Sequence, residues 1–335
     1  MPETPSTTRP AWFRRLPIRP PTIGSFDPAA DRAAALAKLA ELSAQDADLP
    51  EATRTRLLEP DAPTDLTLVI WHGFTNAPPQ FLAVAEHLRD AGFRVLLPRL
   101  PRHGLPDLLN RDLAKLTAQE LVAFIDTCID IAAGLGDRVW VIGLSAGGSL
   151  AAFAAATRAE IGRAVLMAPL VAPSGFPMPA VRLLVKFPRI VPNYYMWWDR
   201  KVKADLSLSQ SPHAYPGFPV PGVMPFLHLS ESLFDGSVPV NHRLERLVLV
   251  TNPNDEAVGQ DAAHAFATRV FEGDADYYGE AHVAESLKWT HDFVDPWSTA
   301  GGSTRQVAAI LAAALGVGEP TGGGVLVPPL VTEQP

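Results

Sequence analysis

The sequence predicts an α/β protein whose central sheet is mostly parallel, has helices on both faces and carries an inserted cap. The first observation is an alternation of short apolar runs with helical patterns over most of the 335 residues. Continuous apolar strands separated by helices are typical of a parallel sheet that is covered on both faces. The second observation is one long stretch in which this alternation stops. With 47% hydrophobic and 19% charged residues, the chain can bury the core that such a fold needs.

Five apolar runs have the length of buried strands, and segments with helical spacing of apolar residues separate them. The predicted strands are 66–71 (LTLVIW), 93–100 (FRVLLPRL), 137–144 (DRVWVIGL), 162–169 (GRAVLMAP) and 246–253 (RLVLVTNP). The predicted helices are 29–42, 78–92, 117–136, 146–159, 259–268 and 303–315.

The stretch from about Leu170 to Glu245 contains eleven prolines and a cluster of aromatic residues. Prolines at this density exclude a central strand or a long helix, so we expect a cap of short helices and loops. The cap is either a packing appendage at the sheet edge or an apolar lid over a substrate pocket. In the second case its aromatic side chains would line the pocket, namely Tyr194, Tyr195, Trp197 and Trp198.

These patterns divide the chain into five segments. We expect a loose N-terminal arm (1–25), a first part of the core (26–170), the inserted cap (171–245), a second part of the core (246–315) and a flexible C-terminal tail (316–335).

Composition excludes several classes of function. A formal net charge of −8 with scattered Lys and Arg argues against a nucleic-acid partner. The single cysteine, Cys128, excludes an internal disulfide or a thiolate metal cluster, and we expect it to be a small buried residue. There is neither a spanning apolar run nor the apolar region of a signal peptide. We therefore expect a cytoplasmic protein without metal or cofactor, whose oligomeric state stays open.

The segment Gly143-Leu144-Ser145-Ala146-Gly147 matches the G-x-S-x-G pattern between a predicted strand and a predicted helix. Such a tight turn holds the serine in a strained conformation, and a side chain at either flank would collide with a neighbouring element. The hydroxyl then lies at the helix N-terminus, where negative charge is favoured. A serine that merely caps the helix would not need glycine on both sides. We therefore predict that Ser145 is a nucleophile, and that Gly148 allows the helix to pack closely on the sheet.

A serine hydroxyl needs a base, and the base needs an acid that orients it. In this chain order the acid is expected first, and Asp255 follows the fifth strand in VTNPNDEAVG. Its alternative role is to cap the helix at 259–268. His291 and His282 both lie downstream, and we predict His291 as the base because it precedes the final helix. His264 is expected on a helix surface, and Asp292 is expected to order the loop of His291.

Two backbone amides could stabilise the oxyanion. Gly73 in WHGFTN permits a sharp turn after the first strand, so the amide of Phe74 can face the serine together with the amide of Ala146. His72 and His103 are expected to be architectural, the first packing and hydrogen-bonding the same loop.

The motifs HGF (72–74), GLSAGG (143–148), PNDEAV (253–258) and HDFVDP (291–296) together resemble the α/β-hydrolase superfamily over about residues 65–315. The first two are most similar to bacterial carboxylesterases and monoacylglycerol-lipase-like hydrolases. The resemblance implies an α/β-hydrolase fold, a Ser145–Asp255–His291 triad, and an oxyanion hole formed by Phe74 and Ala146. One departure is the Asp-Phe pair after His291, which leaves His282 open as the base.

The expected function is hydrolysis of carboxylic esters with apolar or lipid-like acyl groups through an acyl-enzyme, because the cap is apolar. A peptidase, thioesterase, lactonase or acyltransferase could use the same triad, since a fold does not decide the reaction. A hydrolase-like protein that binds a ligand without turnover is the remaining alternative. Haloalkane dehalogenase and epoxide hydrolase activities are disfavoured, because they need a carboxylate where Ser145 stands.

Overall fold

The computed structural model describes residues 19–24, 26–209, 211–271, 275–298, 302 and 304–316. Most of the predicted N-terminal arm (1–18) and nearly all of the predicted C-terminal tail (317–335) lie outside the described residues. No helix in these ranges is both long and apolar enough to cross a bilayer.

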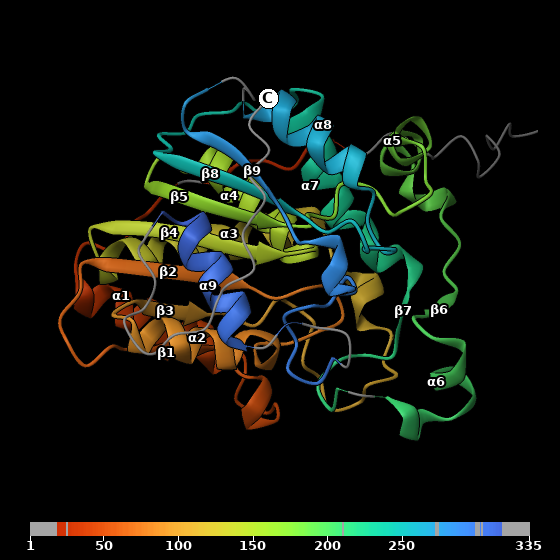
Figure 1. Cartoon of the computed structure of the whole chain (residues 1–335), viewed down its shortest axis with the longest axis horizontal. Helices are drawn as coiled ribbons and strands as arrows, with labels where there is room; N and C mark the ends of the chain where they lie inside the picture. The colour runs from red at the N-terminus through yellow and green to blue at the C-terminus, as the bar shows by residue number, and fades with distance from the viewer. Residues whose placement is uncertain are drawn as a thin grey trace, which may run out of the picture.

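The central sheet has seven strands in the order β1-β3-β2-β4-β5-β8-β9 (Figure 1). Its first strand is antiparallel to its neighbour and the other pairs are parallel. The prediction of a mostly parallel sheet is therefore confirmed. The strands are β1 (Arg56–Leu58), β2 (Leu66–Trp71), β3 (Arg94–Leu97), β4 (Arg138–Leu144), β5 (Ile161–Met167), β8 (Arg246–Thr251) and β9 (Tyr278–His282).

The two strands of the central sheet that the sequence did not predict, β1 and β9, lie at its edges. β1 has only three residues, all half-buried, and β9 (YGEAH) contains Gly, Glu and His instead of an apolar run. An edge strand is covered by fewer neighbours than a central one, so it does not need the continuous apolar pattern that marked the other five.

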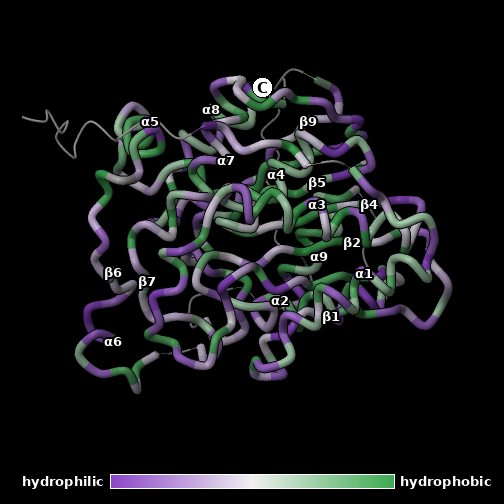
Figure 2. The backbone as a smooth tube through the Cα atoms, turned by 180° about the vertical axis from the view of Figure 1, so that it is seen from behind, coloured by the Kyte–Doolittle hydropathy of each residue, from purple (hydrophilic) through white to green (hydrophobic). Residues whose placement is uncertain are grey.

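Helices cover both faces of this sheet, as predicted. They are α1 (Arg32–Ala44), α2 (Pro79–Asp90), α3 (Ala118–Leu135), α4 (Ala146–Thr157), α8 (Gln260–Val270) and α9 (Thr304–Ala314). α2 packs against α9 on one face, whereas α1, α3 and α4 form a contiguous layer on the other. Figure 2 shows the hydrophobic residues concentrated in the strands and in the helices that flank them.

Residues 171–245 fold into short elements, in keeping with their proline content. These are α5 (Met178–Lys186), β6 (Tyr195–Trp197), α6 (Arg200–Ala204), β7 (Gly217–Pro219) and α7 (Met224–Phe234), with 3-10 turns between them. β6 and β7 form a separate antiparallel pair. α7 packs against α3 and α4 and is largely buried, whereas α5, β6 and α6 run along one side of the molecule (Figure 1).

Candidate active site

Ser145 is the single residue between β4 and α4, and its backbone is strained. It has φ 56° and ψ −116°, which a residue with a side chain rarely adopts. Neighbouring backbone holds this conformation, because its N–H donates to Met167 O (2.9 Å) and its carbonyl accepts from Leu170 N (2.9 Å). The hydroxyl makes no capping hydrogen bond to α4. The helix-cap interpretation of this serine therefore does not hold.

The glycines around Ser145 are required by close backbone approach. A Cβ atom at Gly143 would lie 1.9 Å from Gly147 O, and one at Gly147 would lie 2.1 Å from Trp71 O. The predicted collision of flanking side chains is thus confirmed. At Gly148 a Cβ atom would lie 2.9 Å from Pro169 Cα, so this glycine lets α4 approach the chain that follows β5.

Asp255 lies in the loop after β8, with its carboxylate buried. Its Oδ1 accepts from the backbone N–H of Ala257 (2.8 Å) and Val258 (3.1 Å), and its Oδ2 is 2.6 Å from His291 Nδ1. The N-cap of α8 is Gly259, so Asp255 does not cap that helix. The local amides hold the carboxylate in the orientation that reaches the histidine.

The histidines downstream of Asp255 lie in different settings. His291 is held by Asp255 through Nδ1, which leaves Nε2 for another partner. His282 is the last residue of β9, where its Nδ1 is hydrogen-bonded to the hydroxyl of its register partner Thr251. His264 lies on the exposed face of α8, with Nδ1 2.7 Å from Glu280 Oε1. Of the two candidate bases, the structure brings His291 to the predicted acid.

The loop after β2 is held by the ring of His72. Leu100 N–H donates to His72 Nε2 (3.1 Å), so the ring proton is on Nδ1, which donates to Gly73 O (2.9 Å). Burial lowers the pKa of His72 well below its usual range, and the nearby His103 lowers it further. The ring is therefore neutral. Burial also lowers the pKa of His103 to about 4. Both rings are therefore neutral at neutral pH.

The Gly73–Phe74 peptide is oriented by bonds to its carbonyl. Gly73 O accepts from His72 and also from Asn76 N (3.2 Å). Because a trans peptide is planar, the N–H of Phe74 points away from these two donors. Within the described residues, neither this N–H nor that of Ala146 donates to a protein acceptor.

A largely buried polar cluster joins this loop to the loop of His291. Gln80 accepts from Gly73 N through Oε1 (2.7 Å) and donates from Nε2 to Asp292 Oδ1 (2.9 Å). Asn76 donates to Asp295 Oδ2 (2.9 Å) and to Asp292 Oδ2 (3.3 Å). Burial and then the charge of Asp295 raise the pKa of Asp292 to about 6. Asp292 thus orders its loop, in accord with the expectation from its position.

Sequence reasoning missed Asn76, Gln80 and Asp295 in this cluster. The signal available for Gln80 was a polar residue among the apolar positions at the start of α2, where it is buried. Asn76 and Asp295 gave no signal, because their partner loops are more than 200 residues apart in the chain.

The four aromatic residues predicted to line a pocket have separate surroundings. Trp198 donates from Nε1 to Thr75 Oγ1 (2.8 Å), so it is bonded to the residue after Phe74. The rings of Tyr195 and Trp197 pack against each other at 5.3 Å between centroids, and Tyr194 is about half exposed. Trp198 is therefore the member of this set that reaches the loop after β2.

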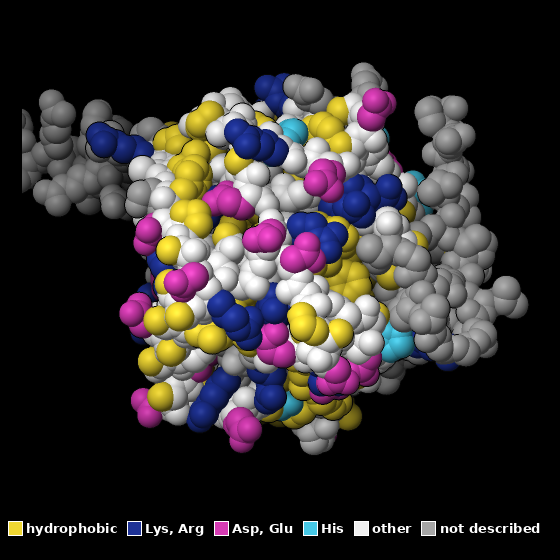
Figure 3. All heavy atoms as spheres, turned by 90° about the vertical axis from the view of Figure 1, so that its left-hand side faces the viewer, with side chains coloured by type: hydrophobic (Ala, Val, Ile, Leu, Met, Phe, Trp, Pro, Cys, Tyr) yellow, Lys and Arg dark blue, Asp and Glu magenta, His cyan; other side chains and the backbone are white. Residues whose placement is uncertain are grey.

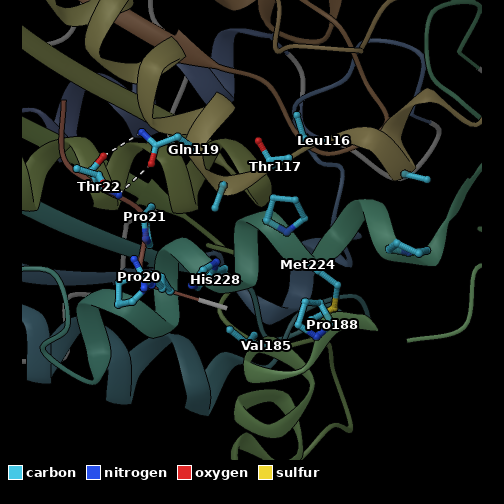
Figure 4. A pocket seen from close by; sticks show the side chains of 15 residues that line it. Pro20, Pro21, Thr22, Leu116, Thr117, Gln119, Val185, Pro188, Met224 and His228 are labelled. Carbon is cyan, nitrogen blue, oxygen red and sulfur yellow. Dashed lines mark hydrogen bonds between the residues drawn. The ribbon is translucent and has the colours of Figure 1, made fainter. Parts of the chain in front are cut away.

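Two cavities lie close to the cap segment. One, of about 590 Å³, is lined by residues 173–178 and by the loop of Asp255. The other, of about 560 Å³, lies between the first described residues, the start of α3 and α7 (Figure 4). Its lining consists mostly of proline and other apolar residues. The side chain of Gln119, which also lines it, exchanges two hydrogen bonds with the backbone of Thr22. Neither Ser145 nor His291 lines either cavity, and no cluster of three potential metal ligands occurs in the described ranges.

Comparison with known proteins gives the family of this chain. Its fold resembles a metagenome-derived lipolytic enzyme from work on LipS and LipT (TM-score 0.54, 16% identity, 79% of this chain and 98% of that one). It also resembles the monoacylglycerol lipase of Paleococcus ferrophilus (0.52, 19%, 68% and 87%). A third is a soluble variant of monoglyceride lipase from Saccharomyces cerevisiae (0.51, 13%, 78% and 90%).

At these identities the likeness concerns the fold. No curated protein sequence matches the chain significantly. Residues 68–281 match the sequence profile described as the alpha/beta hydrolase family. Since this match covers more than half of the chain, the protein belongs to the alpha/beta hydrolase family.

Proposed function

We propose that this protein hydrolyses carboxylic esters through an acyl-enzyme formed on Ser145. The observation that carries the proposal is the 2.6 Å hydrogen bond between His291 Nδ1 and buried Asp255. A histidine held through Nδ1 by a carboxylate keeps Nε2 free to accept a proton, which is the role of the base in a serine triad. The strained backbone of Ser145 supports its assignment as the nucleophile, because strain of this kind clusters at functional sites.

In the first half of the reaction, Ser145 Oγ attacks the ester carbonyl and His291 Nε2 takes its proton. The carbon–oxygen bond to the alcohol breaks, and the alcohol leaves with that proton. In the second half, His291 takes a proton from water, the resulting hydroxide attacks the acyl-enzyme, and the proton returns to Ser145 as the acid leaves. Asp255 holds the histidine and stabilises its charged form throughout.

The negative charge on the carbonyl oxygen is assigned to the amides of Phe74 and Ala146. Each such donor is worth roughly 3 kcal/mol of transition-state stabilisation in comparable sites. His72, Asn76 and Gln80 hold the Gly73 peptides, so the donor of Phe74 is set before substrate binds.

An apolar or lipid-like acyl group is the proposed substrate class. The ring of Phe74 packs against Phe218 and Phe226, with centroids 5.0 Å and 5.6 Å apart, so the surroundings of the proposed oxyanion donor are aromatic. Apolar walls with a few polar groups are typical of sites for small apolar ligands. The lipolytic names of several structurally similar proteins agree with this class.

The test is labelling with a fluorophosphonate probe, together with turnover of p-nitrophenyl esters of graded acyl length. We expect the wild-type protein to be labelled and Ser145→Ala to be neither labelled nor active. Ser149→Ala is the matched control, since Ser149 lies one turn into α4 and its hydroxyl donates to Leu170 O (2.8 Å).

Labelling that persists in Ser145→Ala would contradict the nucleophile. Labelling of Ser145 without ester turnover would point to another acyl substrate, such as a thioester, peptide or lactone. Absence of labelling in the wild-type protein would favour a binding protein.

A further inference from the structure

Large apolar side chains are exposed mainly on one part of the molecule. Of thirteen such side chains among the described residues, eight lie between 176 and 208. We call residues 176–208 the cap face. Its most exposed members around β6 and α6 are Tyr194 (52%), Trp198 (50%) and Leu208 (51%). Exposed apolar side chains gathered in one part of a protein indicate a place where it contacts something else.

The charge of the cap face is opposite to that of the whole protein. It contains six Lys and Arg residues and two Asp residues, although the complete chain carries a net charge of −8. Within the described residues, Lys186, Arg200, Lys201 and Lys203 form no ion pair. Both acidic side chains are occupied, since Asp199 and Asp205 accept hydrogen bonds from the backbone two residues on.

The elements of the cap face share one side of the molecule. α5, β6 and α6 lie along the same side of the molecule in two opposite views (Figures 1 and 2). α6 has no buried residue. The side turned away from the cap differs, because basic and acidic side chains are interspersed there (Figure 3).

We propose that the cap face binds the surface of an anionic lipid bilayer. Exposed aromatic and aliphatic side chains beside unpaired lysines and arginines are the combination that inserts into a lipid interface and attracts anionic headgroups. A second copy of the chain fits less well, because two cap faces would bring their unpaired positive charges together. An anionic bilayer matches both the apolar and the charged part of the surface.

The cap face is connected to the proposed active site through Trp198. Its indole N–H donates to Thr75 Oγ1, and Thr75 follows Phe74. Adsorption through the cap face therefore brings the loop after β2 close to the lipid surface. The binding itself does not depend on the proposed ester hydrolysis, so the two are tested separately.

The experiment is flotation of the full-length protein with vesicles of phosphatidylcholine, alone or mixed with phosphatidylglycerol. We expect binding to the mixed vesicles only, and weaker binding at high salt. The variant Lys201→Glu/Lys203→Glu should bind the mixed vesicles at least about tenfold less, because each basic residue contributes near the surface. Leu206→Ser/Leu208→Ser should also lower binding, because it removes the inserted apolar groups.

The matched charge control is Arg243→Glu/Lys288→Glu, which reverses two exposed positive charges, one before β8 and one after β9, outside the cap face. This variant should bind like the wild-type protein. Equal loss in both charge variants would mean that only net charge matters and would overturn the proposal. Binding to neither kind of vesicle would also overturn it.

Sedimentation velocity without lipid tests whether the cap face instead binds a second copy of the chain. A concentration-dependent dimer that Leu206→Ser/Leu208→Ser abolishes would assign the cap face to a second copy and overturn bilayer binding. Ser145→Ala should bind vesicles like the wild-type protein. A failure of binding with esterase activity intact would therefore leave the proposed function standing.

Discussion

The loops at the carboxyl ends of β4 and β8 and the cap face are built in opposite ways. In these loops, a side chain at Gly143 or Gly147 would collide with neighbouring backbone atoms. Both carboxylate oxygens of Asp255 are hydrogen-bonded. On the cap face, Leu206 and Lys201 are exposed, and Lys201 has no ion-pair partner among the described residues. Contacts within the chain therefore set residue identity in the first region, whereas the second presents side chains for contact outside it.

The largest expected effect concerns the proposed base, His291. His291→Ala should lower ester turnover by about 10⁴-fold, because the serine would lose the group that takes its proton. His282→Ala is the matched control, with a decrease of less than about tenfold, since that ring bonds Thr251 at the end of β9. Steady-state kinetics on one p-nitrophenyl ester separates the two. The reverse order of effects would move the base to His282.

Glycine substitutions compare the packing of the two regions directly. Gly143→Ala should lower the free energy of unfolding by roughly 3 kcal/mol or more, because its Cβ would meet Gly147 O at 1.9 Å. Gly175→Ala, just before the cap face, should cost only about 1 kcal/mol, since it has φ 75° but nothing within 4 Å of the added atom. Urea denaturation measures both. Equal costs would mean that the elbow relaxes around a side chain.

The pH dependence of stability tests the buried cluster beside His291. The pKa of Asp292 is raised from 3.8 to about 6 in the folded protein. Its favourable contribution is therefore complete below the unfolded value and is lost as the pH rises through about 6. Asp292→Asn removes this titration. We expect the stability of the wild type relative to the variant to fall by roughly 2 kcal/mol between about pH 4 and about pH 7.

Chemical denaturation of both proteins across this range gives that difference, in which groups that do not interact with Asp292 cancel. Parallel stability curves would show that Asp292 ionises in the folded protein as it does in the unfolded chain.

The smallest effect is expected on the cap face. Leu206→Ser/Leu208→Ser should change the free energy of unfolding by no more than about 0.5 kcal/mol, because both side chains are about half exposed. Leu166→Ala in β5 should cost about 3 kcal/mol, because Leu166 is fully buried. A large loss of stability from the two serines would mean that the cap face packs against this chain.

Local pattern was sufficient for much of the fold. The five predicted strands and the six predicted helices all occur, because the strands are continuous apolar runs and the helices have apolar residues at helical spacing. The edge strand β9 was not predicted, since Gly279, Glu280 and His282 break any apolar run. α7 fell within the predicted cap because of the proline density of residues 170–245, although it packs on α3 and α4.

The turn from strand to serine to helix follows from local sequence, because the glycines that permit it are neighbours of Ser145 in the chain. The sequence also placed Asp255 after a strand and left His291 and His282 as candidates for the base. Tertiary structure alone decided that His291 reaches Asp255. The reason is that two loops 36 residues apart are brought together by sheet order and chain path, which no local pattern encodes.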